Sequence, residues 1–135
     1  MKIFITGVAG FLGSHLADLM ISQGHTVAGN DNMIGGYTDN VPQDVEFHQV
    51  DCCDLENLTK AMEGCDIVYH TAATAYEGLS VFSPVLVTRN IFEASVTTIT
   101  AAIRNKVKRI VYCSSMARYG HHDEVPYKET YECRP

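Results

Sequence analysis

Short apolar runs alternate along the chain with segments in which apolar residues recur at helical spacing. The apolar runs occupy residues 2–6, 25–30, 45–50, 66–70 and 109–114, and each has the length and continuity of a strand buried on both faces. The periodic segments predict helices over residues 11–23, 55–63 and 83–105. Gly24 and Gly64 are typical helix ends, whereas Asp54 and the Ser83–Pro84 pair are typical helix starts.

This alternation predicts an α/β protein with a Rossmann-like, doubly wound parallel sheet. Right-handed crossovers favour the strand order 3-2-1-4-5, with a reversal between the first and fourth strands. Ligands of such sheets bind at the carboxyl ends of the strands near the reversal. The segments expected there are residues 7–13, Asp31, residues 71–75 and residues 114–119. A connection rich in Gly, Asn, Asp and Pro, residues 32–44, is expected to be mobile surface.

Composition narrows the class of protein. A chain of 135 residues with 46% hydrophobic residues is expected to form one globular domain over residues 1–135. The formal charge of −6, without any run of Lys or Arg, argues against nucleic acid and anionic membranes as partners. No apolar stretch approaches the roughly 18 residues of a membrane span. Five irregularly spaced cysteines fit a reducing, cytoplasmic setting.

Gly7, Gly10 and Gly13 lie between the first strand and the first helix. Glycines at this place let a phosphate approach the free backbone N–H groups and the positive dipole end of a helix. Asp31 follows about 20 residues later, where a carboxylate can accept both ribose hydroxyls of a dinucleotide and repel a 2′-phosphate. The pattern therefore predicts NAD in preference to NADP. A glycine turn without a ligand, and an Asp31 that only caps a turn beside Asn32, remain alternatives.

The stretch TGVAGFLGSH resembles the signature T-G-x-x-G-F-[IL]-G-S-H of the extended short-chain dehydrogenase/reductases, which include the NAD-dependent sugar-nucleotide epimerases and dehydratases. Further stretches agree with that family in the expected order: Asp31 with Asn32, VDCCD, HTAA at residues 70–73, KVKRIVYCSS and SSMARYG at residues 114–120. The resemblance covers nearly the whole chain.

The resemblance implies roles for individual residues. Asp51 would hold the adenine amino group, small residues from Thr71 on would line the nicotinamide ribose, and Ser115 would hydrogen-bond the reacting sugar hydroxyl. A strand-closing Asp51, small residues that serve packing and an ordinary polar Ser115 are the alternatives. Ser115 is the implied catalytic residue, and the implied cofactor contacts are Gly7, Gly10, Phe11, Leu12, Gly13, Asp31, Asn32, Asp51, Cys52, Thr71, Ala72, Ala73, Asn90 and Ser114.

Two departures from the family pattern stand out. Ala94 and Ser95 replace the usual Gly-Thr pair after Asn90. The family's proton acceptor is a tyrosine with a lysine four residues later, and no tyrosine here has that lysine. We therefore expect an N-terminal portion that lacks the catalytic Tyr-x-x-x-Lys segment and the sugar-binding part, with an incomplete sheet whose open edge favours a homo-oligomer.

Met116 and Ala117 stand where the family's dehydratases and decarboxylases carry acids, which favours a UDP-sugar 4-epimerase that transfers a hydride transiently to NAD. A dehydratase or reductase on a nucleotide sugar, a non-catalytic NAD-binding module acting as redox sensor or partner subunit, and an α/β domain without a ligand remain open. His121 and His122 beside Asp123 and Glu124 are interpreted as a solvated loop, so no metal site is expected.

Overall fold

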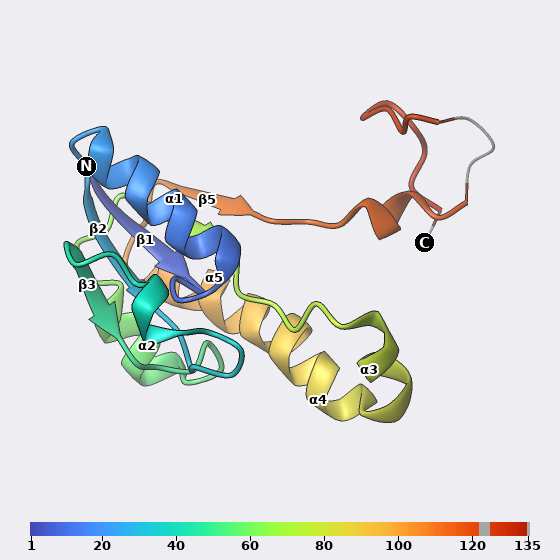
Figure 1. The fold of residues 1–135 in the computed structure, drawn as a ribbon, viewed down its shortest axis with the longest axis horizontal. Helices are drawn as coiled ribbons and strands as arrows, with labels where there is room; N and C mark the ends of the chain where they lie inside the picture. The colour runs from blue at the N-terminus through green and yellow to red at the C-terminus, as the bar shows by residue number, and fades with distance from the viewer. Residues whose placement is uncertain (122–124, 135) are drawn as a thin grey trace.

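The computed structural model describes residues 1–121 and 125–134, which form a five-stranded parallel sheet with helices on both faces (Figure 1). The strand order is β3-β2-β1-β4-β5. This confirms the predicted α/β class, the strand order and the reversal between the first and fourth strands. The strands are β1 (Lys2–Thr6), β2 (Thr26–Asn30), β3 (Val45–His48), β4 (Ile67–His70) and β5 (Arg109–Tyr112).

Alternate residues of β1 face two separate hydrophobic clusters. Ile3 and Ile5 pack under α1 (Phe11–Ser22) together with Ala17, while Phe4 faces the opposite side of the sheet. There α2 (Leu55–Ala61) and α5 (Ala94–Arg104) pack on the sheet and on each other. Since each strand of a pleated sheet presents alternate side chains to opposite faces, the apolar run of β1 serves both layers.

The predicted helix over residues 83–105 is confirmed in its extent, but it is not a regular α-helix throughout, and a short helix that was not predicted precedes it. The structure has α3 (Glu77–Phe82), α4 (Pro84–Thr88) and a π-helical turn, Arg89–Glu93, that leads directly into α5. Within the turn the N–H of Ala94 reaches the carbonyl of Arg89, five residues back. The Ser95 hydroxyl donates to the carbonyl of Ile91 at 2.6 Å, and such back-bonding competes with the regular helical bond. The widened turn lies where apolar periodicity gives no warning.

Of the two residues predicted to cap a helix, Asp54 makes the capping hydrogen bond and Ser83 does not. Asp54 caps α2 as expected, because its carboxylate accepts the N–H of Asn57 at 3.1 Å. Ser83 precedes Pro84 at the start of α4, but its side chain makes no capping hydrogen bond there. Proline at the first helical position needs no capped N–H of its own, which lessens the demand on Ser83.

The connection between β2 and β3 packs against the turn that follows β1. It contains a 3₁₀ turn, Thr38–Asn40. The N–H of Tyr37 and the side-chain amide of Asn40 both donate to the carbonyl of Ala9, each at 3.1 Å. The segment is thus tied to the glycine turn, and its expected mobility stays a prediction.

After β5 the chain leaves the sheet as an extended segment that leads to a 3₁₀ turn, Met116–Tyr119, away from the other helices (Figure 1). Within the described residues no strand pairs with the outer edge of β5. Val111 and Tyr112 are 38% and 49% exposed on that strand. The open edge agrees with the expected incomplete sheet, while association through it remains a prediction. In the described part of the chain, no helix has both the length and the apolar character needed to cross a membrane.

Gly29 in β2 supplies a sharp test of this packing. A Cβ at this position would lie 2.6 Å from the Ile5 carbonyl oxygen and 2.8 Å from Cβ of Val8. We expect Gly29→Ala to lower the free energy of unfolding by about 1–3 kcal/mol, because the added methyl overpacks backbone that cannot shift. Urea denaturation of both proteins measures the change.

The matched control is Gly78→Ala, since a Cβ there would have no heavy atom within 4 Å. The same substitution is expected to be neutral or to stabilise α3 by up to about 1 kcal/mol. A Gly29→Ala protein as stable as the original would contradict the described contact between β1, β2 and the turn.

Candidate functional site

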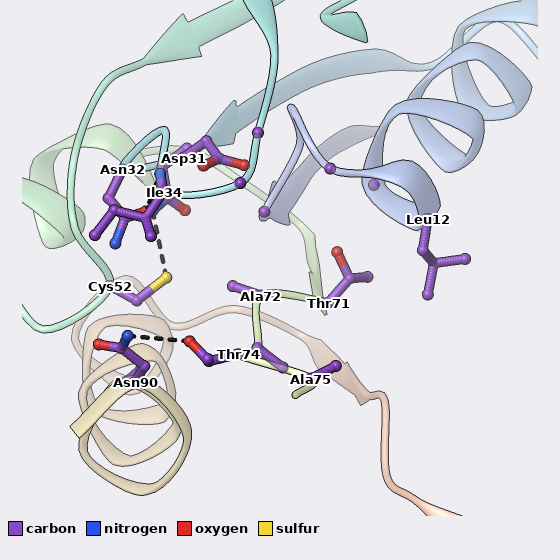
Figure 2. A pocket seen from close by; sticks show the side chains of 18 of the residues that line it. Leu12, Asp31, Asn32, Ile34, Cys52, Thr71, Ala72, Thr74, Ala75 and Asn90 are labelled. Atoms are coloured by element: carbon purple, nitrogen blue, oxygen red, sulfur yellow. Dashed lines mark hydrogen bonds between the residues drawn. The ribbon is translucent and has the colours of Figure 1, made fainter. Parts of the chain in front are cut away.

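A cavity of about 380 Å³ lies at the carboxyl ends of β1, β2 and β4, at the reversal of the strand order (Figure 2). We call it the first cavity. Every predicted cofactor contact except Ser114 lines it: Gly7, Gly10, Phe11, Leu12, Gly13, Asp31, Asn32, Asp51, Cys52, Thr71, Ala72, Ala73 and Asn90. Thr74 and Ala75, which belong to the segment 71–75 expected at this edge, also line it, whereas sequence reasoning missed Asn30, Ile34, Gly35, Gly36, Tyr76 and Ala94.

The glycine turn is fixed by backbone contacts on two sides. Gly7 has a φ of +70°, and a Cβ there would lie 2.9 Å from Cα of Ala72. The N–H groups of Gly7 and Val8 both donate to the carbonyl of Asn30, at 2.7 and 3.1 Å. At Gly13 a Cβ would lie 2.8 Å from the carbonyl carbon of Gly7. The first turn of α1 therefore presses directly on the backbone that follows β1.

The N-terminus of α1 presents unpaired amides to the first cavity. The first intrahelical bond runs from Ser14 N–H to the Gly10 carbonyl at 3.0 Å, so the N–H groups of the preceding helical residues have no intrahelical acceptor. In the described part of the chain no side chain caps this end, and its first turn carries no acid. Free N–H groups and the positive end of the helix dipole together form a cradle for a phosphate.

Asp31 has a structural role as well as a place in the cavity wall. It is 8% exposed, and its Oδ2 accepts the N–H of Ala9 at 3.1 Å. Its Oδ1 accepts the N–H of Met33 at 2.8 Å, which is the turn-capping contact of the alternative hypothesis. Because an ionised carboxylate offers about four lone-pair positions, these two bonds leave acceptor capacity for ribose hydroxyls.

Asp51 lies at another part of the same wall and is held as an anion. Burial raises the pKa of its carboxyl, but three hydrogen bonds outweigh burial and hold that pKa below its ordinary value. The donors are the N–H of Cys53 at 2.8 Å, the amide of Asn32 at 3.3 Å and the guanidinium of Arg89 at 3.2 Å. Arg89 lies 38 residues along the chain, so no local spacing signals this ion pair.

Amides support two further lining residues. Asn90, in the π-helical turn, donates to the hydroxyl of Thr74 at 3.0 Å (Figure 2). The buried amide of Asn30 donates to Cys52 Sγ at 3.3 Å and to the carbonyl of Val50 at 2.8 Å. Burial raises the pKa of the Cys52 thiol, so this sulfur stays protonated at neutral pH. These contacts fix the cavity wall without adding charge to it.

Thr6 joins the ends of β1 and β4. Its Oγ1 accepts the N–H groups of Thr71 and Ala72, each at 3.1 Å. With both acceptor positions in use, its own proton points to Nδ1 of His70 at 2.8 Å. His70 therefore accepts at Nδ1, which makes the imidazole neutral with its proton on Nε2.

The Nε2–H of His70 completes a chain of bonds to the π-helical turn. It donates to Oγ of Ser95 at 3.0 Å, and Ser95 in turn donates to the carbonyl of Ile91. Burial lowers the pKa of His70, in agreement with the neutral form that the bonds require. Ser95, which with Ala94 replaces the family's usual Gly-Thr pair, thus has a defined place in the network.

A second cavity, of about 510 Å³, adjoins the first and shares residues 71–76 with it. Ser114 lines this second cavity, together with the catalytic candidate Ser115, and does not line the first. Ser115 Oγ accepts the N–H of Ala117 at 3.1 Å and so caps the 3₁₀ turn. That bond uses an acceptor position and leaves the hydroxyl proton available to a ligand. Arg118, which belongs to the expected segment 114–119 but was not named as a contact, also lines the second cavity.

Metal ligation has no candidate cluster in residues 1–121 and 125–134, where no group of three or more His, Cys, Asp or Glu side chains is placed to hold an ion. His122, Asp123 and Glu124, three members of the stretch interpreted as a solvated loop, lie outside the described residues.

Comparison with known families places these features in context. The model of the NAD dependent epimerase/dehydratase family matches residues 3–135. The chain is 31% identical over 135 residues to the UDP-glucose 4-epimerase of Corynebacterium glutamicum, a match that covers 100% of this chain and 41% of that protein. It is also 31% identical over 138 residues to the probable UDP-arabinose 4-epimerase 3 of Arabidopsis thaliana, covering 94% of this chain and 34% of that protein.

Solved structures agree with the sequence matches. The UDP-glucose 4-epimerase of Thermus thermophilus in complex with NAD has a TM-score of 0.92 at 33% identity, over 100% of this chain and 45% of that one. The UDP-glucose 4-epimerase of Thermotoga maritima with UDP-glucose has a TM-score of 0.93 at 29% identity, with the same two coverages. The chain therefore spans less than half the length of the relatives it matches.

The His70 network predicts a pH-dependent component of stability. Because the folded pKa lies below the ordinary value of 6.5, the unfolded chain binds the proton first as the pH falls. This component is present above pH 6.5 and is lost as the pH falls through the lower folded pKa, with a slope of at most about 1.4 kcal/mol per pH unit. His70→Gln removes it, so the stability difference between the two proteins is expected to shrink from pH 7.5 to pH 5.

Urea titrations at several pH values measure that difference. His15→Gln is the matched control, since His15 is exposed on α1 and its pairing with the Phe11 carbonyl stays within the helix. A difference between wild type and His70→Gln that is constant with pH would show that His70 is not held neutral by this network.

Proposed function

Because the chain belongs to the NAD-dependent epimerase/dehydratase family, we propose that residues 1–135 are the NAD-binding part of a nucleotide-sugar 4-epimerase that acts on a UDP sugar. One observation carries the proposal: thirteen of the fourteen predicted cofactor contacts, all except Ser114, line a single cavity at the reversal of the sheet. The UDP-sugar 4-epimerases among the matched relatives support the substrate class.

Three sets of groups in the first cavity contact three different parts of the cofactor. The free amides at the start of α1 hold the pyrophosphate, which approaches them because Gly10 has no side chain. Asp31 accepts the hydroxyls of the adenosine ribose, and Asp51, kept ionised by its three donors, accepts the adenine amino group. When bound, NAD supplies the group that takes up and returns a hydride.

The same arrangement favours NAD over NADP. The Asp31 carboxylate is buried and already fixed by two backbone N–H groups, so it cannot swing away from a 2′-phosphate. Two anionic groups brought together in a partly buried site repel each other more strongly than in water. Arg89 does not offset this repulsion, because its guanidinium is engaged by Asp51.

Ser115 is the residue that holds the reacting sugar hydroxyl. One acceptor position of its hydroxyl is used by Ala117 N–H, and the hydroxyl proton and the other acceptor position remain available to the substrate. No His is placed within hydrogen-bonding distance of its Oγ in the described residues, so it acts by positioning rather than as a nucleophile. Elimination of water needs an acidic side chain that donates a proton, and neither Met116 nor Ala117 has an ionisable side chain. Their presence favours epimerisation over dehydration.

The proton acceptor for the sugar hydroxyl lies outside these residues in this proposal. Tyr112, Tyr119, Tyr127 and Tyr131 are followed four positions later by Met, Asp, Tyr and Pro, so none has the lysine that would lower its pKa. The relatives are more than twice as long as this chain. We therefore assign the Tyr-x-x-x-Lys pair to a segment beyond residue 135.

Asp31→Ala tests the cofactor assignment. We expect NAD affinity to fall by about tenfold to a hundredfold, because hydrogen bonds to a charged group are worth about 1.5–3 kcal/mol. Isothermal titration calorimetry with NAD and with NADP measures both affinities, and the preference for NAD should narrow. Asp44→Ala removes an exposed acid at a distance from the cavity and should leave NAD affinity unchanged.

Asp31→Asn separates the ribose contact from the turn contacts. Asparagine keeps an acceptor for one of the two backbone N–H groups and places its own NH2 against the other, so it disturbs the turn less than alanine does while NAD affinity still falls. Urea denaturation checks that both variants are folded before NAD is titrated. Unchanged NAD affinity in both Asp31 variants would remove the ribose assignment. Absence of saturable NAD binding by the original protein would overturn the proposed function itself.

A second candidate is a non-catalytic NAD-binding module, favoured by the missing tyrosine–lysine pair. Both candidates bind NAD, so the reading frame of the gene after codon 135 separates them. The epimerase proposal expects Tyr-x-x-x-Lys in frame shortly after Pro135. A stop codon at that point, together with NAD binding and no turnover of UDP-glucose, would favour the module.

A further inference from the structure

Arg118 places a positive charge in the lining of the second cavity, whereas the charged side chains that line the first cavity are acids. The first cavity has two acids in its wall, Asp31 and Asp51. Of the described residues that line the second, Arg118 alone has a formal charge at neutral pH, because the bonds around His70 keep that imidazole neutral. The remaining polar side chains of that lining are hydroxyl and thiol groups. In a chain of net charge −6, this is a local site for an anion.

The contacts of Arg118 hold its side chain without neutralising it. Its Nε–H donates to Cys133 Sγ at 3.2 Å, and its guanidinium carbon lies 5.0 Å from the centre of the Tyr119 ring. By contrast, Arg89 and Arg104 form ion pairs with carboxylates. No carboxylate of the described residues pairs with Arg118, so both Nη groups remain available to a bidentate anion.

Arg118 and Ser115 are one helical turn apart. The N–H of Arg118 donates to the Ser115 carbonyl at 3.3 Å across the 3₁₀ turn, whose N-cap is Ser115. Residues three apart in a 3₁₀ helix lie above one another, separated by about 6 Å along the axis. When a sugar hydroxyl is bound at Ser115, an anionic group elsewhere on the same ligand can therefore reach the guanidinium of Arg118.

We propose that Arg118 binds an anionic group of the nucleotide sugar whose reacting hydroxyl lies at Ser115. This inference rests on the proposed function. Two groups of a nucleotide sugar have the required chemistry. One is a carboxylate at C6, next to the C4 hydroxyl in the same sugar, and the other is the diphosphate at C1.

Arg118→Gln and Arg118→Lys test the inference in the full-length product of the gene, saturated with NAD, because the sugar-binding part is not expected within residues 1–135. Lys128→Gln is the matched control, because it removes the same charge from the same segment at a side chain that lies over Tyr131 and does not line the second cavity. Calorimetric titrations use UDP-glucuronate, UDP-glucose and UDP. We expect Arg118→Gln to weaken binding of the preferred nucleotide sugar about tenfold or more. Arg118→Lys should recover part of the loss, because it restores the charge without the planar fork.

The pattern of losses identifies the anionic group. If a carboxylate is bound, the original protein prefers UDP-glucuronate to UDP-glucose, and Arg118→Gln abolishes that preference. If the diphosphate is bound, Arg118→Gln weakens all three ligands by the same factor.

Arg118→Gln that binds every ligand as the original does, or an original protein that binds NAD but none of the three ligands, overturns the inference. Failure of NAD binding, by contrast, would count against the proposed function, and the two failures are therefore distinguishable.

Discussion

The approach of β1 to its two neighbours, backbone against backbone, is the constraint on which the rest of the structure depends. Gly7 and Val8 donate to the end of β2, and the Thr6 hydroxyl accepts two N–H groups from the segment that follows β4. Since a Cβ at Gly7 would collide with Ala72, the close approach exists only with glycine at this position. It opens the start of α1 toward the first cavity and fixes the cavity wall from both sides of the reversal.

The two cavities differ in the charge of the groups that line them. The ionised Asp51, held by its donors, and the buried Asp31 suit hydroxyl and amino groups, while the free amides of α1 suit a phosphate. In the second cavity the neutral His70 leaves Arg118 as the source of charge in the described lining. A ligand that spans both cavities therefore meets acceptors, amide donors and a cation in succession.

The alternation of apolar runs with helical segments and the handedness of crossovers were enough to predict the strand order, and a local signal predicted the Asp54 cap. Of the first cavity wall, the residues themselves predicted the glycine turn and Asp31, and the resemblance to the family implied further positions such as Asp51 and Asn90. The π-helical turn and α3 escaped prediction, since a widened turn leaves apolar periodicity almost unchanged. Arg89 and Asp51 are 38 residues apart, and their pairing depends on the folded register of distant elements. Asp31 shows a further limit: the pattern offered a turn cap and a ribose ligand as alternatives, whereas the carboxylate makes the turn contacts from within the cavity wall.

The shared wall, residues 71–76, links cofactor and substrate in the proposed enzyme. Thr6 and Gly7 fix its first residues through backbone N–H groups and close contact, so this part of the wall moves with β1. Ser115 and Arg118 belong instead to the segment after β5, whose contacts with each other run along one short turn. The geometry of hydride transfer would thus depend on the centre of the sheet, and the choice of substrate on its edge. Substitutions at residue 118 can then change substrate binding without disturbing the cofactor, because neither Ser115 nor Arg118 lines the first cavity.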